Sequence, residues 1–131
     1  MSMSITNKSQ FNEMQSQWSN FSYEELACQH CGSMNLSQDF LVALQELRDA
    51  VAMPMTITSG YRCAEHPIEK AKSSPGFHNR GAVDIAAQGS SAYHILKIAL
   101  SESLGWTGIG IAKDFIHLDR RPNEATTMWT Y

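Results

Sequence analysis

The stretch His78-Asn79-Arg80-Gly81-Ala82-Val83-Asp84 contains the strongest structural and chemical signal in the chain. On one helix, this spacing would place the histidine and the aspartate on different faces. The two side chains can converge if His78 ends a loop, Gly81 adopts an unusual backbone angle and Asp84 lies on the strand that follows. The motif therefore predicts a loop that runs into a strand over residues 82–86.

A second histidine belongs to the stretch Asp114-Phe115-Ile116-His117. Residues 106–111 and 115–118 are rich in β-branched and aromatic side chains and predict two strands joined by the turn around Ala112-Lys113. Alternation along the second strand puts Phe115 and His117 on one face. We expect His117 to meet the histidine and the aspartate of the first motif from a neighbouring strand.

Two imidazole nitrogens and one carboxylate oxygen are a typical ligand set for catalytic zinc, which keeps a fourth position open. The predicted ligands are His78, Asp84 and His117. Asp114, three residues before the last ligand, is a candidate acid/base group, and its simpler interpretation is an ordinary turn aspartate. Asp119 is either an alternative base or a partner that orients a ligand histidine.

Arg62 follows a Ser-Gly-Tyr turn at the end of the predicted strand 55–59. A fixed cation near the metal could bind a substrate carboxylate or stabilise an oxyanion, whereas the simpler alternative is a surface salt bridge. Residues 60–81 show no sustained period and are expected to form a long loop between the two site segments.

The remaining segments predict a mixed architecture. Ser37 is expected to cap a helix with an apolar stripe that ends before Pro54, and residues 91–103 predict a second amphipathic helix. Residues 1–20 are polar and are expected to form a partly ordered leader before one domain over residues 21–131. The fold class is α+β, with a small, mainly antiparallel sheet and flanking helices.

Composition excludes several functions. The chain has 131 residues, a net charge of −3 and a pI near 5.9, which argues against a nucleic-acid partner. No window is apolar enough for a membrane span, and the first residues lack the features of a secretory signal. We expect a monomer made in the cytoplasm that needs another route to act outside the membrane.

The cysteines form a second candidate cluster. Cys28-x-x-Cys31 and Cys63-x-x-His66 have the half-site spacing of a Cys₃His structural zinc, with His30 as a spare donor. Ordinary thiols are the simpler interpretation, and one disulfide with a leftover thiol is a third. The sequence leaves these alternatives open.

Taken together, the motifs resemble those of the M15 family of zinc D,D-carboxypeptidases and L-alanyl-D-glutamate endopeptidases, which act on bacterial peptidoglycan. The matching pieces are residues 21–27, residues 57–62, Glu65-His66-Pro67, residues 78–84, residues 115–119, Trp129 and Tyr131.

The resemblance implies a hedgehog-like fold and one zinc ion held by the three predicted ligands. It further implies Asp114 as the acid/base group and Arg62 as the transition-state arginine. The implied substrate is the peptidoglycan peptide stem. A small domain of this kind fits a phage-type endolysin released through holin lesions, or a virion-associated enzyme. Two alternatives are a non-catalytic domain that binds cell wall or protein, and a cytoplasmic D,D-dipeptidase.

Overall fold

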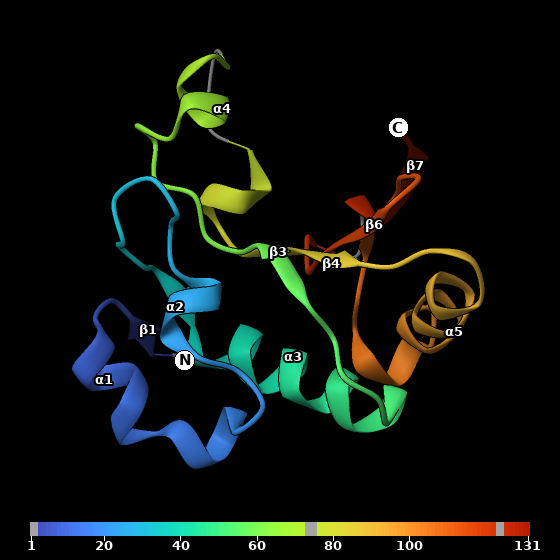
Figure 1. Cartoon of the computed structure of the whole chain (residues 1–131), viewed down its shortest axis with the longest axis horizontal. Helices are drawn as coiled ribbons and strands as arrows, with labels where there is room; N and C mark the ends of the chain where they lie inside the picture. Colours follow the sequence, from blue (N-terminus) through green and yellow to red (C-terminus); the bar gives the residue numbers. More distant parts are fainter. Residues whose placement is uncertain (1–2, 73–75, 123–124) are drawn as a thin grey trace.

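The computed structural model describes residues 3–72, 76–122 and 125–131 (Figure 1). The α-helices are α1 (Lys8–Glu13), α2 (Tyr23–Leu26), α3 (Gln38–Val51), α4 (Pro67–Lys70) and α5 (Gly89–Ala99). The short 3₁₀ helices are η1 (Gln15–Trp18), η2 (Phe77–Asn79) and η3 (Glu102–Leu104). The strands are β1 (Ser4–Ile5), β2 (Leu36–Ser37), β3 (Ile57–Ser59), β4 (Ala82–Ala86), β5 (Gly108–Ile111), β6 (Phe115–Asp119) and β7 (Thr127–Thr130).

The main sheet has the strand order β3-β4-β6-β5-β7. Its neighbouring strands are antiparallel except β5 and β7, which are parallel, and β1 pairs with β2 in a separate small sheet. The structure thus confirms the predicted α+β class. The sequence analysis did not predict β7, because this strand is short and mostly exposed and lacks the apolar alternation of a buried strand.

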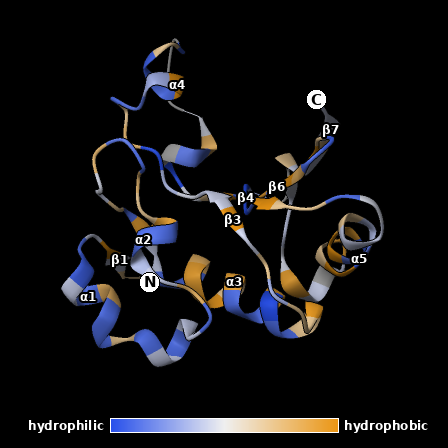
Figure 2. Cartoon of the chain, viewed as in Figure 1, coloured by the Kyte–Doolittle hydropathy of each residue, from blue (hydrophilic) through white to orange (hydrophobic). Residues whose placement is uncertain are grey.

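The two faces of the main sheet have different roles. In β4 and β6 the side chains of Val83, Ile85, Ile116 and Leu118 are buried in the core. Because side chains alternate across a strand, the intervening residues point to the opposite face. The helices α3 and α5 pack together on the core side, whereas α4 lies on the other side (Figures 1 and 2). The face away from α3 and α5 is therefore available for a functional site.

Helix α3 begins where the sequence predicts. The Ser37 hydroxyl accepts a hydrogen bond from the Phe40 N–H at 3.0 Å, and the helix ends at Ala52 with φ of 59°. An N-cap of this kind is worth about 1 kcal/mol. The apolar stripe of α3 is buried from Phe40 to Val51, as its periodicity indicates.

The N-terminal residues that the sequence analysis assigned to a partly ordered leader contribute to the core. Ile5, Phe11 and Trp18 are fully buried, and the Phe11 and Trp18 rings lie 5.4 Å apart. The segment is polar on average, but these three apolar side chains are buried by contacts with the rest of the chain.

Residues 60–81 contain more regular structure than the expected loop. Helix α4 starts with Pro67, and the preceding His66 side chain caps it by accepting the Ile68 N–H. Proline at the first helical position has a backbone angle that favours a helix, so it supports the start of α4. The helix has only four residues, too few to show helical periodicity in the sequence. Helix α5 starts two residues earlier than predicted, and η3 follows it. No helix among the described residues has the length and apolarity needed to cross a bilayer.

Candidate metal centre

Three donor atoms meet on the face of the sheet away from α3 and α5. His78 Nε2, Asp84 Oδ1 and His117 Nδ1 form a triangle in which each separation is 3.2 Å. A tetrahedral zinc with bonds of 2.0–2.1 Å keeps its ligand atoms about 3.3 Å apart. The spacing and the donor types both fit one zinc ion, and the three residues are at most 7% exposed.

Two local features bring the donors together. Asp84 on β4 lies directly opposite His117 on β6 in the antiparallel register. His78 lies in η2, and the chain then turns through Gly81 with φ of 143°, a value that residues with a side chain rarely adopt. This confirms the unusual backbone angle predicted for Gly81. The glycine lets the chain pass from η2 into β4 within a few residues.

Each of the two candidate ligand histidines is oriented by a hydrogen bond at its other ring nitrogen. His78 Nδ1 lies 2.8 Å from the carbonyl oxygen of Gly60, which can only accept, so this nitrogen carries the proton and Nε2 is free to bind metal. His117 Nε2 lies 2.7 Å from Asp119 Oδ2, which leaves Nδ1 for the metal. Such outer partners fix the tautomer and the ring orientation of metal ligands.

Asp119 is itself held by an arginine that the sequence analysis did not single out. Arg121 Nε donates a hydrogen bond to Asp119 Oδ1 at 2.8 Å, and Arg121 Nη2 donates one to Asp119 Oδ2 at 2.6 Å. The guanidinium also lies 4.1 Å from the centre of the Phe77 ring and 4.9 Å from that of Trp129. Strand alternation in β6 was a signal for Asp119, since residues two apart on a strand share a face, whereas Arg121 lies beyond the end of this strand.

Trp129 on β7 closes one side of the centre. Its ring lies 5.1 Å from the His117 ring and is positioned over Gly110 of β5, which faces it in the parallel register. A Cβ at Gly110 would come within 2.7 Å of the indole. The glycine therefore makes room for an aromatic wall that includes Tyr131 and Phe115, whose rings are 5.1 Å apart.

Hydrogen bonding among these groups affects their pKa values more than burial does. Burial raises the pKa of the Asp119 carboxyl, but hydrogen bonds from Arg121 and His117 lower this pKa to about 2. At Asp84 burial is likewise outweighed by His117 and His78, which hold the pKa of the carboxyl well below its usual range. Burial lowers the pKa of His117, yet its hydrogen bonds to the two carboxylates raise it above the ordinary value. Both carboxylates are therefore ionised at neutral pH.

Arg62 lies beside the three donors. Its Nε donates a hydrogen bond to the Ser59 hydroxyl at 3.2 Å, and its Nη1 donates one to Glu69 Oε2 at 3.3 Å. Its Nη2 lies 3.6 Å from Asp84 Oδ2. The Glu69 side chain is fully buried and also binds Lys72 and the Gly76 N–H. Burial raises the pKa of Glu69, but these partners outweigh it and lower the pKa below its ordinary value. A buried carboxylate thus anchors the guanidinium in place.

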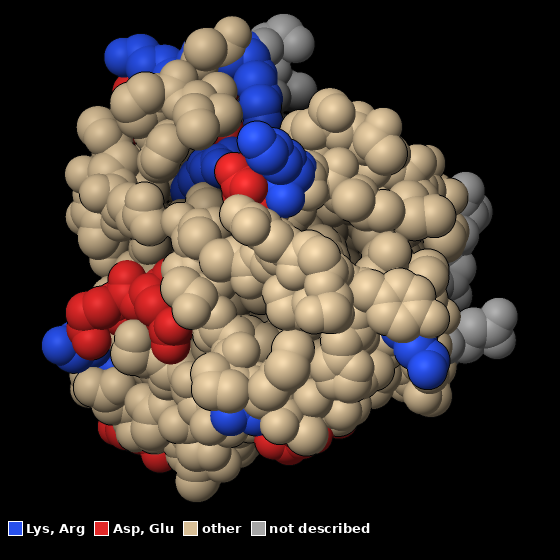
Figure 3. Space-filling view, turned by 45° about the vertical axis from the view of Figure 1, so that its right-hand side comes forward, with Lys and Arg blue, Asp and Glu red and all other residues tan. Residues whose placement is uncertain are grey.

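The donors open into a cavity of about 500 Å³. It is lined by Arg62, Ile68, Lys72, Gly76, Phe77, His78, Asp84, Phe115, His117, Arg121, Trp129 and Tyr131. Three of these side chains are cationic, and Figure 3 shows lysine and arginine gathered around a few acidic atoms in the upper part of the molecule. The cavity combines an aromatic wall with basic groups, which suits a substrate that carries a carboxylate.

Asp114 lies at the edge of this arrangement. Its carboxylate accepts a hydrogen bond from Gln88 Nε2 at 2.7 Å, and its carbonyl accepts from the Ala87 N–H. It is not among the described residues that line the cavity. The structure therefore brings together the three predicted ligands, Arg62 and Asp119, and it holds Asp114 beside the start of α5.

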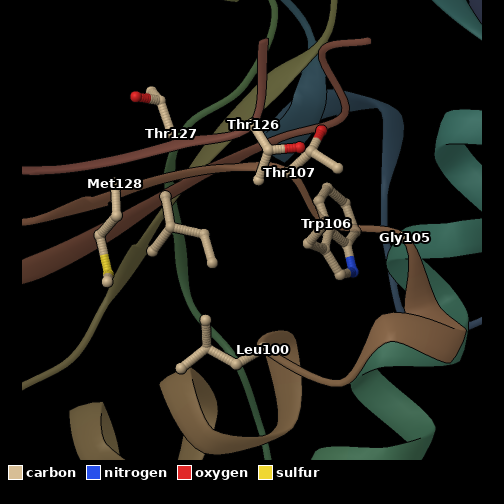
Figure 4. A pocket seen from close by; sticks show the side chains of 8 residues that line it. Leu100, Gly105, Trp106, Thr107, Thr126, Thr127 and Met128 are labelled. Atoms are coloured by element: carbon tan, nitrogen blue, oxygen red, sulfur yellow. The ribbon is translucent and has the colours of Figure 1, made fainter. Parts of the chain in front are cut away.

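A second cavity, of about 580 Å³, lies between the end of α5 and the strands β5 and β7 (Figure 4). Its lining residues are Leu100, Gly105, Trp106, Thr107, Ile109, Thr126, Thr127 and Met128, none of which is titratable near neutral pH. The described residues of this second cavity therefore offer no histidine, cysteine or carboxylate for metal binding or for acid/base chemistry.

Replacing Asp119 by asparagine is expected to weaken zinc binding by about 10- to 100-fold. An amide cannot supply the negative charge that makes His117 a stronger ligand and that pairs with Arg121. Zinc retention against a competing chelator measures the effect. Asp49→Asn on α3 is the control, and an unchanged zinc affinity in Asp119→Asn would show that the outer hydrogen bond does not support the ligand.

Two histidines and a carboxylate that line one cavity form a candidate metal site, and their donor set is typical of catalytic centres that keep a fourth position for water or substrate. The family model for peptidase M15 matches residues 19–119. The chain therefore belongs to the peptidase M15 family. The matched region contains the three donors together with Arg62, Asp114 and Asp119. Comparisons with curated proteins and with solved structures found no match.

Proposed function

We propose that this protein is a zinc-dependent peptidase that hydrolyses an amide bond in the peptide stem of bacterial peptidoglycan. The observation that carries the proposal is the triangle of His78, Asp84 and His117 donors at the floor of a basic, aromatic cavity. Membership of the peptidase M15 family supports the reaction class. The stem peptide is rich in carboxylates, which suits the cations of the cavity.

In this proposal the bound metal and the cationic residues around the donors have different roles in hydrolysis. A zinc ion held here supplies a Lewis acid that polarises the scissile carbonyl and makes water more acidic. Arg62 is fixed by Glu69 and directs its guanidinium toward Asp84, so it can bind a substrate carboxylate or the oxyanion that develops on the carbonyl. Lys72 and Arg121 add positive charge along the same cavity.

The aromatic wall positions the substrate. Trp129 on the edge strand β7 and Tyr131, just after this strand, have ring centres 6.4 Å apart, and Trp129 contacts His117. Because these flat apolar surfaces line the same cavity as Arg62, we expect them to hold the peptide beside the donors. Productive geometry therefore depends on β7, which lies outside the region matched by the family model.

Proton transfer is assigned to Asp114 as part of this proposal. Catalytic hydrogen bonds are often completed only when substrate binds, and the Asp114 carboxylate must then leave Gln88. We expect Asp114→Asn to lower kcat by about 10²-fold or more while zinc stays bound. Gln88→Ala, which frees the carboxylate, should retain activity. Full activity in Asp114→Asn would assign proton transfer to another group.

The function is tested with purified protein, zinc analysis and peptidoglycan sacculi. We expect about one catalytic zinc per chain, release of new amino groups from sacculi, and loss of that release on chelation followed by recovery with zinc. Bound zinc without release from sacculi or from defined muropeptides would instead support a non-catalytic binding domain.

Mass spectrometry of the products identifies the bond. Loss of one D-alanine from a pentapeptide stem indicates a D,D-carboxypeptidase, whereas separation of L-alanine from D-glutamate indicates an endopeptidase. Hydrolysis of free D-alanyl-D-alanine alone would indicate a cytoplasmic D,D-dipeptidase. We propose action on the cell wall after release from the cytoplasm, as in phage-type lysis, so that sacculi and muropeptides are the expected substrates.

A further inference from the structure

A second group of metal-binding side chains lies away from the zinc centre proposed above. The sulfur atoms of Cys28, Cys31 and Cys63 all lie within 4.8 Å of one another. Cys28 and Cys63 come from segments 35 residues apart, and their sulfurs are separated by 3.6 Å. The three cysteines are unpaired in the structure. Tertiary folding therefore gathers every thiol of the chain into one cluster.

The backbone around the first two cysteines forms a tight turn. The Gly32 N–H donates to the Cys28 carbonyl at 2.7 Å, and the Cys28 N–H donates back to Ser33 at 2.8 Å. The Cys63 N–H in turn lies 3.4 Å from Cys28 Sγ. Backbone N–H groups directed at sulfur stabilise a thiolate, the form in which cysteine binds metal.

The spacing fits a metal better than a disulfide. Tetrahedral zinc with Zn–S bonds of 2.3 Å keeps its sulfur atoms about 3.8 Å apart, close to the 3.6 Å between Cys28 and Cys63. A disulfide between these two would leave Cys31 beside it as an unpaired thiol. Zinc uses all three sulfurs and needs one more donor. Two imidazoles stand close by, His30 and His66, with ring centres 6.2 Å apart.

His66 is not part of the described cysteine group, although the sequence analysis considered it as the fourth donor. Its Nδ1 accepts the Ile68 N–H at the start of α4, so Nε2 is the nitrogen left for a metal. His30 lies between the two cysteines of the Cys-x-x-Cys turn. Both rings belong to the chain segments that carry the cysteines, which makes each a candidate fourth donor.

We propose that Cys28, Cys31 and Cys63 bind a structural zinc ion whose fourth ligand is His30 or His66. Binding releases the three thiol protons and joins the turn after α2 to the segment after β3. That segment is held on both sides, because Tyr61 N–H donates to Leu26 and Arg62 N–H donates to His78. The ion would therefore stabilise the backbone that carries Arg62.

The test counts zinc in the whole protein purified under reducing conditions. Wild type is expected to hold about two zinc ions per chain, and Cys31→Ser and Asp84→Asn about one each, because each variant removes one site. The two variants are reciprocal controls, so failure of the peptidase proposal is distinguishable from failure of this one. Cobalt substitution should give sulfur-to-metal charge-transfer absorption in wild type and in Asp84→Asn, but not in Cys31→Ser.

Three results would overturn the proposal. One is a zinc content that is the same in wild type and Cys31→Ser. Another is a mass for the native protein, purified without reductant, that shows a Cys28–Cys63 disulfide and no second zinc. The third is unchanged zinc retention against a chelator in the double variant His30→Ala/His66→Ala, since a closed structural site requires one of these imidazoles.

Discussion

Replacing Asp84 by asparagine is expected to abolish zinc binding at the proposed centre and to lower kcat/KM by about 10³-fold or more. Asp84 Oδ1 lies 3.2 Å from both His78 Nε2 and His117 Nδ1 and supplies the negative charge of the triangle. The amide has the same shape but no charge. A Lewis acid lowers the activation free energy by several kcal/mol, and each 1.36 kcal/mol changes the rate by a factor of about ten.

Zinc analysis and hydrolysis of muropeptides measure this effect. Asp49→Asn makes the same chemical change on α3, where the carboxylate accepts a hydrogen bond from Gln45, and should leave both quantities unchanged. Circular dichroism shows whether Asp84→Asn stays folded, which we expect because a neutral group costs less to bury than a carboxylate. Activity near the wild-type level in the folded variant would exclude a catalytic metal held by Asp84.

Replacing Arg62 by methionine is expected to lower kcat by about 10²- to 10³-fold while zinc stays bound. The guanidinium lies 3.3 Å from Glu69 and 3.6 Å from Asp84, so it is fixed beside the donors without being a ligand. Loss of a preorganised donor affects the transition state more than metal affinity. Arg62→Lys keeps the charge but not the planar fork, and an intermediate rate is expected.

Steady-state kinetics with a defined stem peptide separate the two roles considered for Arg62. A loss mainly in kcat indicates stabilisation of the oxyanion, and a rise mainly in KM indicates binding of a substrate carboxylate. Arg48→Met, in the last turn of α3, is the matched control. Unchanged kcat and KM in Arg62→Met would remove this residue from the mechanism and leave its contacts with Glu69 a purely structural role.

Much of the candidate site follows from short-range rules of chain geometry. Alternation along strands predicts that Asp84 and His117 leave the core face, because Val83, Ile85, Ile116 and Leu118 are apolar at the intervening positions. The need for glycine at position 81 follows in the same way from the change of direction between η2 and β4. These features are encoded within a few residues, so the sequence reveals them.

The features that the sequence did not reveal depend on contacts between distant segments. The parallel strand β7, the burial of Ile5 and Phe11 and the stacking of Arg121 on Phe77 and Trp129 all require partners far along the chain. Local pattern contains no information on such partners, since an exposed edge strand and a polar N-terminal segment both resemble loops.

The sequence by itself determined the types of the candidate ligands, the α+β class and the strands that present Asp84 and His117, because these depend on side-chain chemistry and on periods of a few residues. Only the tertiary structure decided that the donors stand 3.2 Å apart, that Asp119 supports His117, and that Asp114 is bound to Gln88. Separations of this kind are set by the register and twist of the strands and by the packing of the aromatic wall, which arise only when the whole chain has folded.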